Sequence, residues 1–200
     1  MADIISSNKV LAVEGKDEAI FFDALLQYVG ISDVDIQSVG GKRQFKNKLP
    51  ALVRMSGFSE VDILAVVRDA DNDANAAFQS IREILRKEKL EPPNRPNQFS
   101  QGRPLVGIYI MPGNSDTGML EDLCLKTVKN HPAMKCVVDF VNCVKKLDDP
   151  PNNITKAKAQ VFLAAMPQIA REVGIGAQKG YWNFDADELD DLRTFINKLR

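Results

Sequence analysis

The sequence predicts an α/β protein with a four-stranded, mainly parallel sheet flanked by helices, followed by a mostly helical C-terminal extension. Short apolar runs alternate with amphipathic helix patterns across residues 1–125, the longest run is rich in β-branched residues, and the second part of the chain is mainly helical in pattern. Alternation of this kind favours a parallel sheet with right-handed crossovers. We therefore expect an α/β core over residues 1–125 and a helical extension over residues 126–200, packed on the core.

The four strands are expected at residues 9–14, 34–39, 63–67 and 105–111. The third is an unbroken apolar run, which is typical of a strand buried on both faces. The second is more amphipathic and suits a position nearer an edge. Between the third and fourth strands, residues 91–104 carry several prolines, so we expect an irregular loop there.

Three helices are expected between these strands. Asp17 is a suitable N-cap for the first, and Gly30 is a suitable C′ residue. The second follows a Gly-Gly turn, and Pro50 should kink or divide it. The third should begin at Asn72 or Asp73. The extension should contain helices at residues 119–128, 133–146, 155–173 and 187–199, with Thr155 as a cap and glycines 174 and 176 ending the long one.

Composition narrows the classes of function. The net charge is −1, so binding of nucleic acid would depend on a local basic patch. No run of about 18 apolar residues exists, and the N-terminus lacks the features of a signal peptide, so we expect a cytoplasmic protein without membrane contact.

Cys124, Cys136 and Cys143 match no zinc module and are expected to be reduced thiols. His131 is the single histidine, so catalysis by a Ser-His-Asp or Cys-His arrangement has almost no residues to draw on.

Three acids follow the third strand, at Asp69, Asp71 and Asp73. Residues i and i+2 on a strand share a face, so Asp69 and Asp71 should project together from the edge where open α/β sheets bind ligands. Two carboxylates about 4 Å apart repel by roughly 4 kcal/mol at an effective dielectric near 20, which a cation would relieve. The plainer alternative is that Asp69 caps a loop and that Asp71 or Asp73 caps the next helix.

Glu14 ends the first strand. If the first and third strands are neighbours, about 4.8 Å apart, Glu14 meets Asp69 and Asp71 at one edge. Ligands that are all oxygen favour Mg²⁺ or Mn²⁺, and Mg²⁺ commonly binds one or two carboxylates together with a substrate phosphate. The pattern therefore indicates phosphodiester chemistry.

These residues carry a family resemblance. Val13-Glu14-Gly15-Lys16-Asp17-Glu18 before a helix, with Asp69-Ala70-Asp71 after a later strand, resembles the Toprim domain, whose signature is a strand-end glutamate in an E-G-x-x-D context and a later D-x-D. That family includes topoisomerases, bacterial primases, RecR-type repair proteins, a ribosomal-RNA maturase and OLD-family nucleases. The resemblance covers roughly residues 8–125 and implies a Rossmann-like core. The whole chain is similar to small, stand-alone Toprim-like bacterial proteins.

The resemblance also implies roles for individual residues. Glu14 would be a general acid/base or a metal ligand, and Asp69 and Asp71 would hold Mg²⁺ or Mn²⁺. Glu121 resembles a later metal-binding acid of OLD-like nucleases, although at position N3 of a helix capped by Gly118 it would also simply favour the helix dipole. Lys158 resembles a catalytic lysine that would stabilise the scissile phosphate, and Lys156 competes for that role.

A basic cluster after the Gly-Gly turn comprises Lys42, Arg43, Lys46 and Lys48. It would receive a phosphate backbone, or it is a solvated helix face. We expect contacts with nucleic acid from Lys16, Gly41, Lys42 and Arg43. A partner protein or a homo-oligomer is left open.

Three functions remain open from the sequence. The first is a Mg²⁺-dependent enzyme acting on nucleic-acid phosphodiesters, in particular a Toprim-type nuclease. The second is a non-catalytic Toprim module that binds nucleic acid or a protein. The third is a phosphatase of the haloacid-dehalogenase type, because an apolar strand followed by D-x-D also opens that family. In that family the first aspartate is a nucleophile.

Overall fold

The computed structural model describes residues 4–200, except for the side chain of Lys42. It contains one five-stranded sheet in the order β2-β1-β3-β5-β4. The strands are β1 (Lys9–Val13), β2 (Asp35–Ser38), β3 (Ile63–Asp69), β4 (Gln98–Phe99) and β5 (Leu105–Met111). All neighbouring pairs are parallel except β4 with β5. The α/β class is therefore confirmed, and the more amphipathic strand, β2, lies at an edge.

The predicted count of four strands is wrong, because β4 adds an antiparallel edge strand within the proline-rich loop. A strand of two residues is too short to show an alternation of apolar and polar side chains, so the sequence pattern gave no signal for β4. Packing explains its place: a Cβ built on Gly107 of β5 would lie 2.4 Å from ring carbons of Phe99. The glycine therefore leaves the room in which the β4 ring lies on the sheet.

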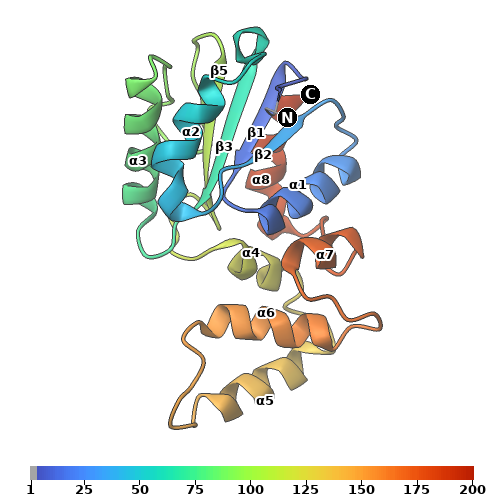
Figure 1. Ribbon diagram of the computed structural model, residues 1–200. Helices are drawn as coiled ribbons and strands as arrows, with labels where there is room; N and C mark the ends of the chain where they lie inside the picture. The colour runs from blue at the N-terminus through green and yellow to red at the C-terminus, as the bar shows by residue number, and fades with distance from the viewer. Residues whose placement is uncertain (1–3) are drawn as a thin grey trace.

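Helices cover both faces of the sheet (Figure 1). On one face lie α2 (Phe45–Val53) and α3 (Ala74–Lys87), whose apolar side chains share a core with β1, β3 and β5. On the other face lie α1 (Lys16–Tyr28) and α8 (Asp190–Ile196). Pro50 lies inside α2 without dividing it. Short 3₁₀ turns occur at Lys42–Gln44, Phe58–Glu60, Asp187–Leu189 and Asn197–Leu199, so the last predicted helix is broken into three pieces.

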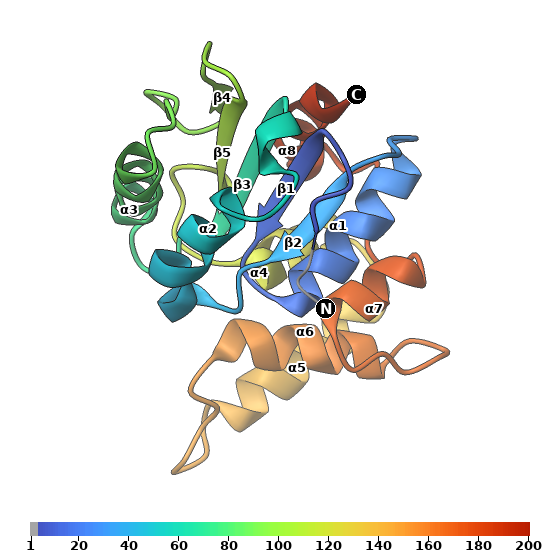
Figure 2. The ribbon, with the colours of Figure 1, turned by 45° about the horizontal axis from the view of Figure 1, so that its top comes forward.

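The remaining helices are α4 (Leu120–Thr127), α5 (Met134–Val144), α6 (Ile154–Ala164) and α7 (Val173–Gln178). The α5–α6 pair projects beyond α4, at the end of the sheet where β1 and β3 finish (Figures 1 and 2). Its buried side chains continue the core of the α1 face. The predicted boundary at residue 125 falls inside α4, and the division into two domains stays a prediction. Within residues 4–200, no helix is long and apolar enough to cross a membrane.

The long helix predicted at residues 155–173 is wrong. The chain leaves the helix after Ala164 and forms α7 only at Val173. Asn153, rather than Thr155, caps α6, since its side chain accepts a hydrogen bond from the Lys156 N–H. The glycines expected to end the helix instead lie inside α7, where a Cβ on Gly174 would lie 2.4 Å from the Asp17 carbonyl oxygen. Gly174 allows α7 to pack closely against α1, and Gly176 allows it to approach Leu163 and Trp182.

Candidate functional site

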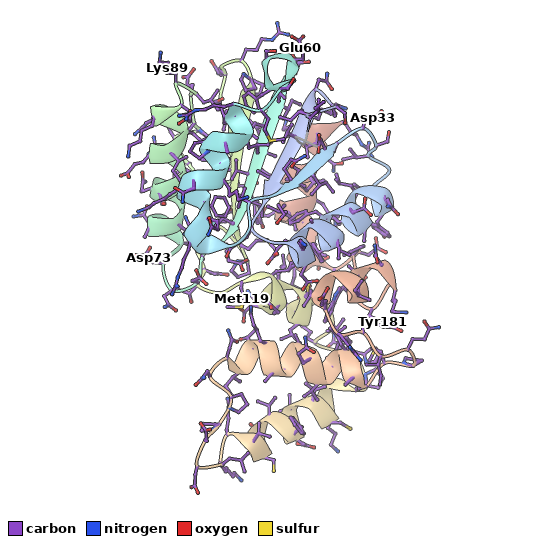
Figure 3. The ribbon with its side chains drawn as sticks, viewed as in Figure 1. Asp33, Glu60, Asp73, Lys89, Met119 and Tyr181 are labelled. Carbon is purple, nitrogen blue, oxygen red and sulfur yellow. The ribbon has the colours of Figure 1, made fainter. Side chains whose placement is uncertain are left out.

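The carboxyl ends of β1 and β3 lie side by side. The two strands pair directly and in parallel, with Ala12 opposite Val66. Glu14 follows the last residue of β1, and Asp69 is the last residue of β3. The sheet thus places both acids at its C-terminal edge, on strands separated by about 4.8 Å. The condition set for the convergence of the acids, that the first and third strands be neighbours, is therefore met. Figure 3 labels Asp73 and Met119 near the same edge.

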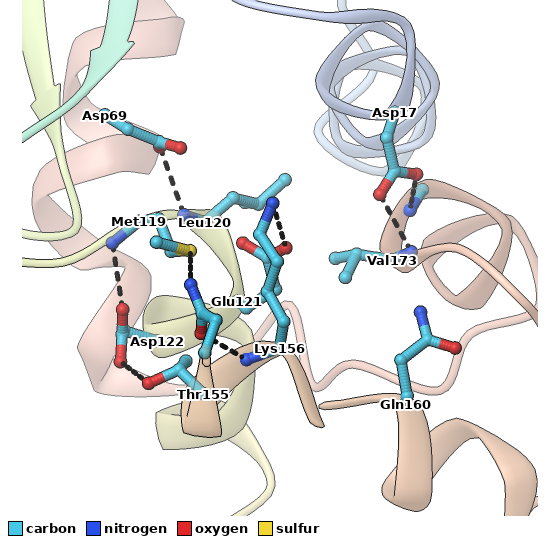
Figure 4. A network of polar contacts seen from close by, with 12 residues as sticks. Asp17, Asp69, Met119, Leu120, Glu121, Asp122, Thr155, Lys156, Gln160 and Val173 are labelled. Carbon is cyan, nitrogen blue, oxygen red and sulfur yellow. Dashed lines mark hydrogen bonds and ion pairs between the residues drawn. The ribbon is translucent and has the colours of Figure 1, made fainter. Parts of the chain in front are cut away.

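Asp69 is the buried centre of this edge. Its residue is 9 % exposed, and its Oδ1 accepts a hydrogen bond of 3.1 Å from the Leu120 N–H at the start of α4 (Figure 4). Burial raises the pKa of Asp69 well above its usual value, and the negative charges of Glu14, Glu18, Glu121 and Asp71 raise it further, in that order. Because each charge opposes ionisation of Asp69, these five acids form one electrostatic group, which we call the carboxylate cluster.

Asp71 reaches this edge by a different route from the one predicted. Strand β3 ends at Asp69, and Asp71 has a left-handed φ of 52°, so the alternation of side chains along a strand does not place it. Instead its backbone pairs with Gly118: the Asp71 N–H donates to the Gly118 carbonyl at 2.8 Å, and the reverse bond is 2.7 Å. Asp73 accepts a hydrogen bond from the Ala76 N–H and caps α3. The plainer prediction is therefore confirmed for Asp73.

Glu121 lies in the first turn of α4, although not in the predicted register. Met119 is the N-cap in place of Gly118, and Asp122 occupies N3, where its Oδ2 accepts a 2.9 Å hydrogen bond from the Met119 N–H. Asp122, and not Glu121, therefore makes the capping hydrogen bond at the start of α4. Its side chain is largely buried, at 14 % exposure, and its Oε1 lies 3.6 Å from the Lys156 Nζ.

The start of α6 places a cation beside the acids. Thr155 donates a 3.0 Å hydrogen bond to the second oxygen of Asp122, which joins α6 to α4 (Figure 4). This contact places Lys156, whose side chain is 59 % exposed, beside Glu121. Lys158 is half-buried on the same helix and makes no hydrogen bond or ion pair with a described residue. The geometry thus favours Lys156 over Lys158 for the charge-stabilising role.

Sequence reasoning missed two acids in the first turn of α1. A Cβ on Gly15 would lie 2.6 Å from Oε2 of Glu18, so the Glu18 carboxylate folds back over the turn after Glu14. Burial, and then the charges of Glu14, Asp17 and Glu121, raise the pKa of Glu18. A signal was present, because Glu18 stands at the acidic position of the E-G-x-x-D pattern.

Asp17 does not cap α1, which begins at Lys16 with Gly15 as its N-cap. Its carboxylate instead accepts hydrogen bonds of 3.0 and 2.6 Å from the Val173 and Gly174 N–H groups at the start of α7. Burial raises the pKa of Asp17 despite these bonds. Asp17, three residues after the strand-end Glu14, thus attaches the start of α7 to α1 at this edge of the sheet.

The residues predicted to contact nucleic acid differ in their surroundings. Lys16 and Arg43 are exposed. The Gly41 N–H donates a 2.7 Å hydrogen bond to the Glu14 carbonyl, so this donor is already used within the chain. The side chain of Lys42 lies outside the described part of the structure, which covers only its backbone in the 3₁₀ turn.

The donor set of the cluster suits a hard cation. All five acids offer carboxylate oxygen, and a cation would relieve the repulsion that raises the pKa of Asp69. Within residues 4–200, however, no group of three or more His, Cys, Asp or Glu side chains comes close enough together to hold a metal ion. The described acids therefore share one electrostatic environment without forming a ready three-ligand metal site.

A large hollow lies away from the cluster. It measures about 1070 Å³ and is lined by polar and aromatic side chains that include Tyr28, His131 and Trp182. None of the five cluster acids lines it. The candidate site is therefore proposed from the charges that surround Asp69, and not from the volume of a hollow.

The fold and the edge define an α/β protein whose parallel sheet carries clustered carboxylates at its C-terminal edge. A family model described as "Protein of unknown function (DUF3226)" matches residues 8–200, so the chain belongs to this family. Comparison with curated proteins gave no match.

Two solved structures share the fold. The C-terminal region of the OLD protein of Xanthomonas campestris pv. campestris aligns over 98 % of this chain and 97 % of its own, with a TM-score of 0.50 and 12 % identity. The C-terminal region of the Burkholderia pseudomallei OLD protein aligns over 98 % of this chain and 100 % of its own, with a TM-score of 0.50 and 13 % identity. At this identity the likeness concerns the fold.

Proposed function

We propose that this protein is a Toprim-type nuclease that cleaves phosphodiesters of nucleic acid with Mg²⁺ or Mn²⁺. The observation that carries the proposal is the pairing of β1 with β3, which brings Glu14 beside a buried Asp69 whose ionisation the neighbouring acids oppose. Buried, mutually repelling carboxylates at a ligand-binding edge are a typical signature of a functional site. The shared fold of the OLD C-terminal regions supports this reading.

Each residue has a role in this proposal. Asp69 and Asp71 would hold the metal, whose shell water and phosphate would complete, and Glu14 or Glu121 would act through a coordinated water. A divalent ion bound there would polarise the phosphodiester and lower the pKa of a coordinated water. Glu14 would accept the proton of the attacking water. Lys156 would neutralise charge that develops on the phosphate.

The test is a cleavage assay with matched variants. Labelled single- and double-stranded DNA and RNA are incubated with purified protein and Mg²⁺, Mn²⁺ or EDTA. We expect cleavage that needs the metal and is abolished by Asp69→Asn. Asp73→Asn is the control, because it removes the same charge four residues away and Asn also caps helices well. Metal-dependent activity that persists in Asp69→Asn would end the proposal.

A second candidate is a non-catalytic module that binds nucleic acid. It is favoured by the finding that no three potential metal ligands converge within residues 4–200. The same preparations distinguish the two functions. Saturable binding of an oligonucleotide, without turnover in any metal, would establish the binding module instead of the nuclease.

A further inference from the structure

Arg68 is a buried cation without a described polar partner. It precedes Asp69 in β3, and neighbouring strand residues point to opposite faces, so Arg68 lies with Val66 and Ala70 on the side of α2 and α3. It is 7 % exposed, and its buried Nε has no hydrogen-bond partner among the described residues. Its guanidinium lies over the Phe45 ring, 5.2 Å from the ring centroid.

Burial of this guanidinium without a hydrogen-bond partner at Nε destabilises the fold. A guanidinium keeps its charge at any physiological pH, so burial cannot be relieved by loss of a proton. Contact with the Phe45 ring offsets part of the desolvation cost, although an aromatic face accepts no N–H hydrogen bond as strong as that of an anion. A buried, charged fork with open donor capacity suits an anion from outside the chain.

Arg68 lines a hollow that two further basic side chains also line. This hollow, which we call the Arg68 cavity, measures about 570 Å³ and is lined by Arg43, Phe45, Lys46, Arg68 and Ser80. It holds three cations and a hydroxyl, and no acid lines it. Two of its residues belong to the basic cluster that the sequence showed after the Gly-Gly turn. The cavity thus assigns that cluster a specific place in the fold.

The Arg68 cavity adjoins a second hollow. This hollow of about 480 Å³ lies between α2 and α3 and shares Lys46 and Ser80 with the first. Acids line this second hollow, including Glu88, which is paired with Arg54 at 2.6 Å. The anion site is therefore the first hollow, next to the edge that carries Asp69.

We propose that the Arg68 cavity binds a backbone phosphate of a nucleic-acid strand, and so holds the strand beside the carboxylate cluster. The planar fork of arginine matches the paired oxygens of a phosphate, and the exposed Arg43 and Lys46 add charge at the mouth. This inference rests on the proposed function for the identity of the ligand. Its geometric basis, a buried arginine in a hollow that two further cations and no acid line, is independent of the carboxylates.

The test measures binding without metal, so that cleavage plays no part. Affinity for a fluorescein-labelled single-stranded 12-mer in EDTA is followed by anisotropy over a salt series. We expect Arg68→Met to weaken binding by about tenfold or more, with Arg68→Lys intermediate because it keeps the charge and loses the fork. Lys46→Gln should lower the salt slope by about one, and Lys48→Gln on the same helix, outside the cavity, should change it less.

Two further measurements make the outcome decisive. Inorganic phosphate should shift the Arg68 Nε–Hε NMR signal in the wild type, and a shift by phosphate without any Arg68-dependent oligonucleotide binding would overturn nucleic acid as the ligand. Arg68→Met should unfold at the same or a higher urea concentration, because it removes an unpaired buried charge. If that variant fails to fold, the Arg43→Gln/Lys46→Gln double variant replaces it.

Failure of this inference is separable from failure of the proposed function. Unchanged oligonucleotide binding by Arg68→Met, with cleavage still lost in Asp69→Asn, would refute the cavity alone. Arg68-dependent binding without metal-dependent cleavage would refute the nuclease alone.

Discussion

Replacement of Asp69 by asparagine should stabilise the protein while it abolishes metal-dependent cleavage. Asparagine keeps a side-chain oxygen for the Leu120 N–H, which Asp69 now binds at 3.1 Å, and it removes only the charge. Burial and four neighbouring carboxylates raise the pKa of Asp69, so the ionised form destabilises the fold at neutral pH. A residue kept at such a cost is expected where function requires it.

The size of the effect follows from linkage. Each unit by which folding raises a carboxyl pKa corresponds to about 1.4 kcal/mol of stability lost at neutral pH. We expect a gain of about 0.5–2 kcal/mol for Asp69→Asn at neutral pH, the range common for single stabilising substitutions. For a chain of this size, the thermal midpoint should rise by about 2–4 °C per kcal/mol.

Urea unfolding of both proteins between pH 4 and pH 8 provides the measurement. Between the unfolded pKa of aspartate, about 3.9, and the raised folded value, the native wild type binds more protons than the unfolded chain. Its stability therefore falls as pH rises through this window, whereas Asp69→Asn lacks the part of this fall that Asp69 causes and keeps the part due to Asp17 and Glu18. The gap should be near zero at about pH 4 and constant above the folded pKa. Saturating Mg²⁺ should stabilise the wild type more than the variant.

The reasoning would be refuted by an Asp69→Asn protein that is no more stable than the wild type at pH 7. It would also be refuted by a gap of the same size at pH 4, because the charge would then not be its cause. Asp73→Asn serves as control again, since Asp73 is exposed, and it should change stability by less than about 0.5 kcal/mol at every pH.

Three further predictions concern the support of the carboxylate cluster. Gly118→Ala should lower the free energy of unfolding in urea by about 1–3 kcal/mol, because Gly118 has a φ of 129° and a Cβ there would lie 2.7 Å from the Asp122 Oδ2. Gly180→Asn is the control and should be tolerated better, because Gly180 has a left-handed φ with open space around its Cβ position. Lys156→Met should slow cleavage by about tenfold or more, and a larger loss in Lys158→Met would instead assign the charge-stabilising role to Lys158. Thr155→Val should cost about 1 kcal/mol in thermal unfolding, because it removes the bond to Asp122, and the exposed Thr194→Val should change little.

The core elements were predictable where the local pattern coincides with the final packing. Strand β3 is an apolar, β-branched run because it lies in the middle of the sheet, between β1 and β5. Gly30, with a φ of 70°, takes the left-handed C′ position after α1, as predicted. Strand β4 was not predictable, since its two residues pair only because Gly107 on another strand leaves room for Phe99.

The C-terminal helices show why periodicity alone misleads. An apolar pattern continues past Ala164, and glycines 174 and 176 resembled a helix end. In the fold these glycines are needed inside α7, where Gly174 approaches α1 and Gly176 approaches Leu163 and Trp182. A glycine signals a lack of steric bulk, and only the neighbouring chain decides whether that space ends a helix or admits another backbone.

The sequence by itself determined the α/β class, the positions of the main strands along the chain and the strand-end acids Glu14 and Asp69, because these depend on short-range periods and on where an apolar run stops. Tertiary structure decided the rest of the site. The bridge of Asp71 to Gly118, the approach of Lys156 to Glu121 and the burial of Arg68 against Phe45 each join segments distant in the chain. Charge and burial depend on distances in space, and these exist only once the helices have packed around the edge of the sheet.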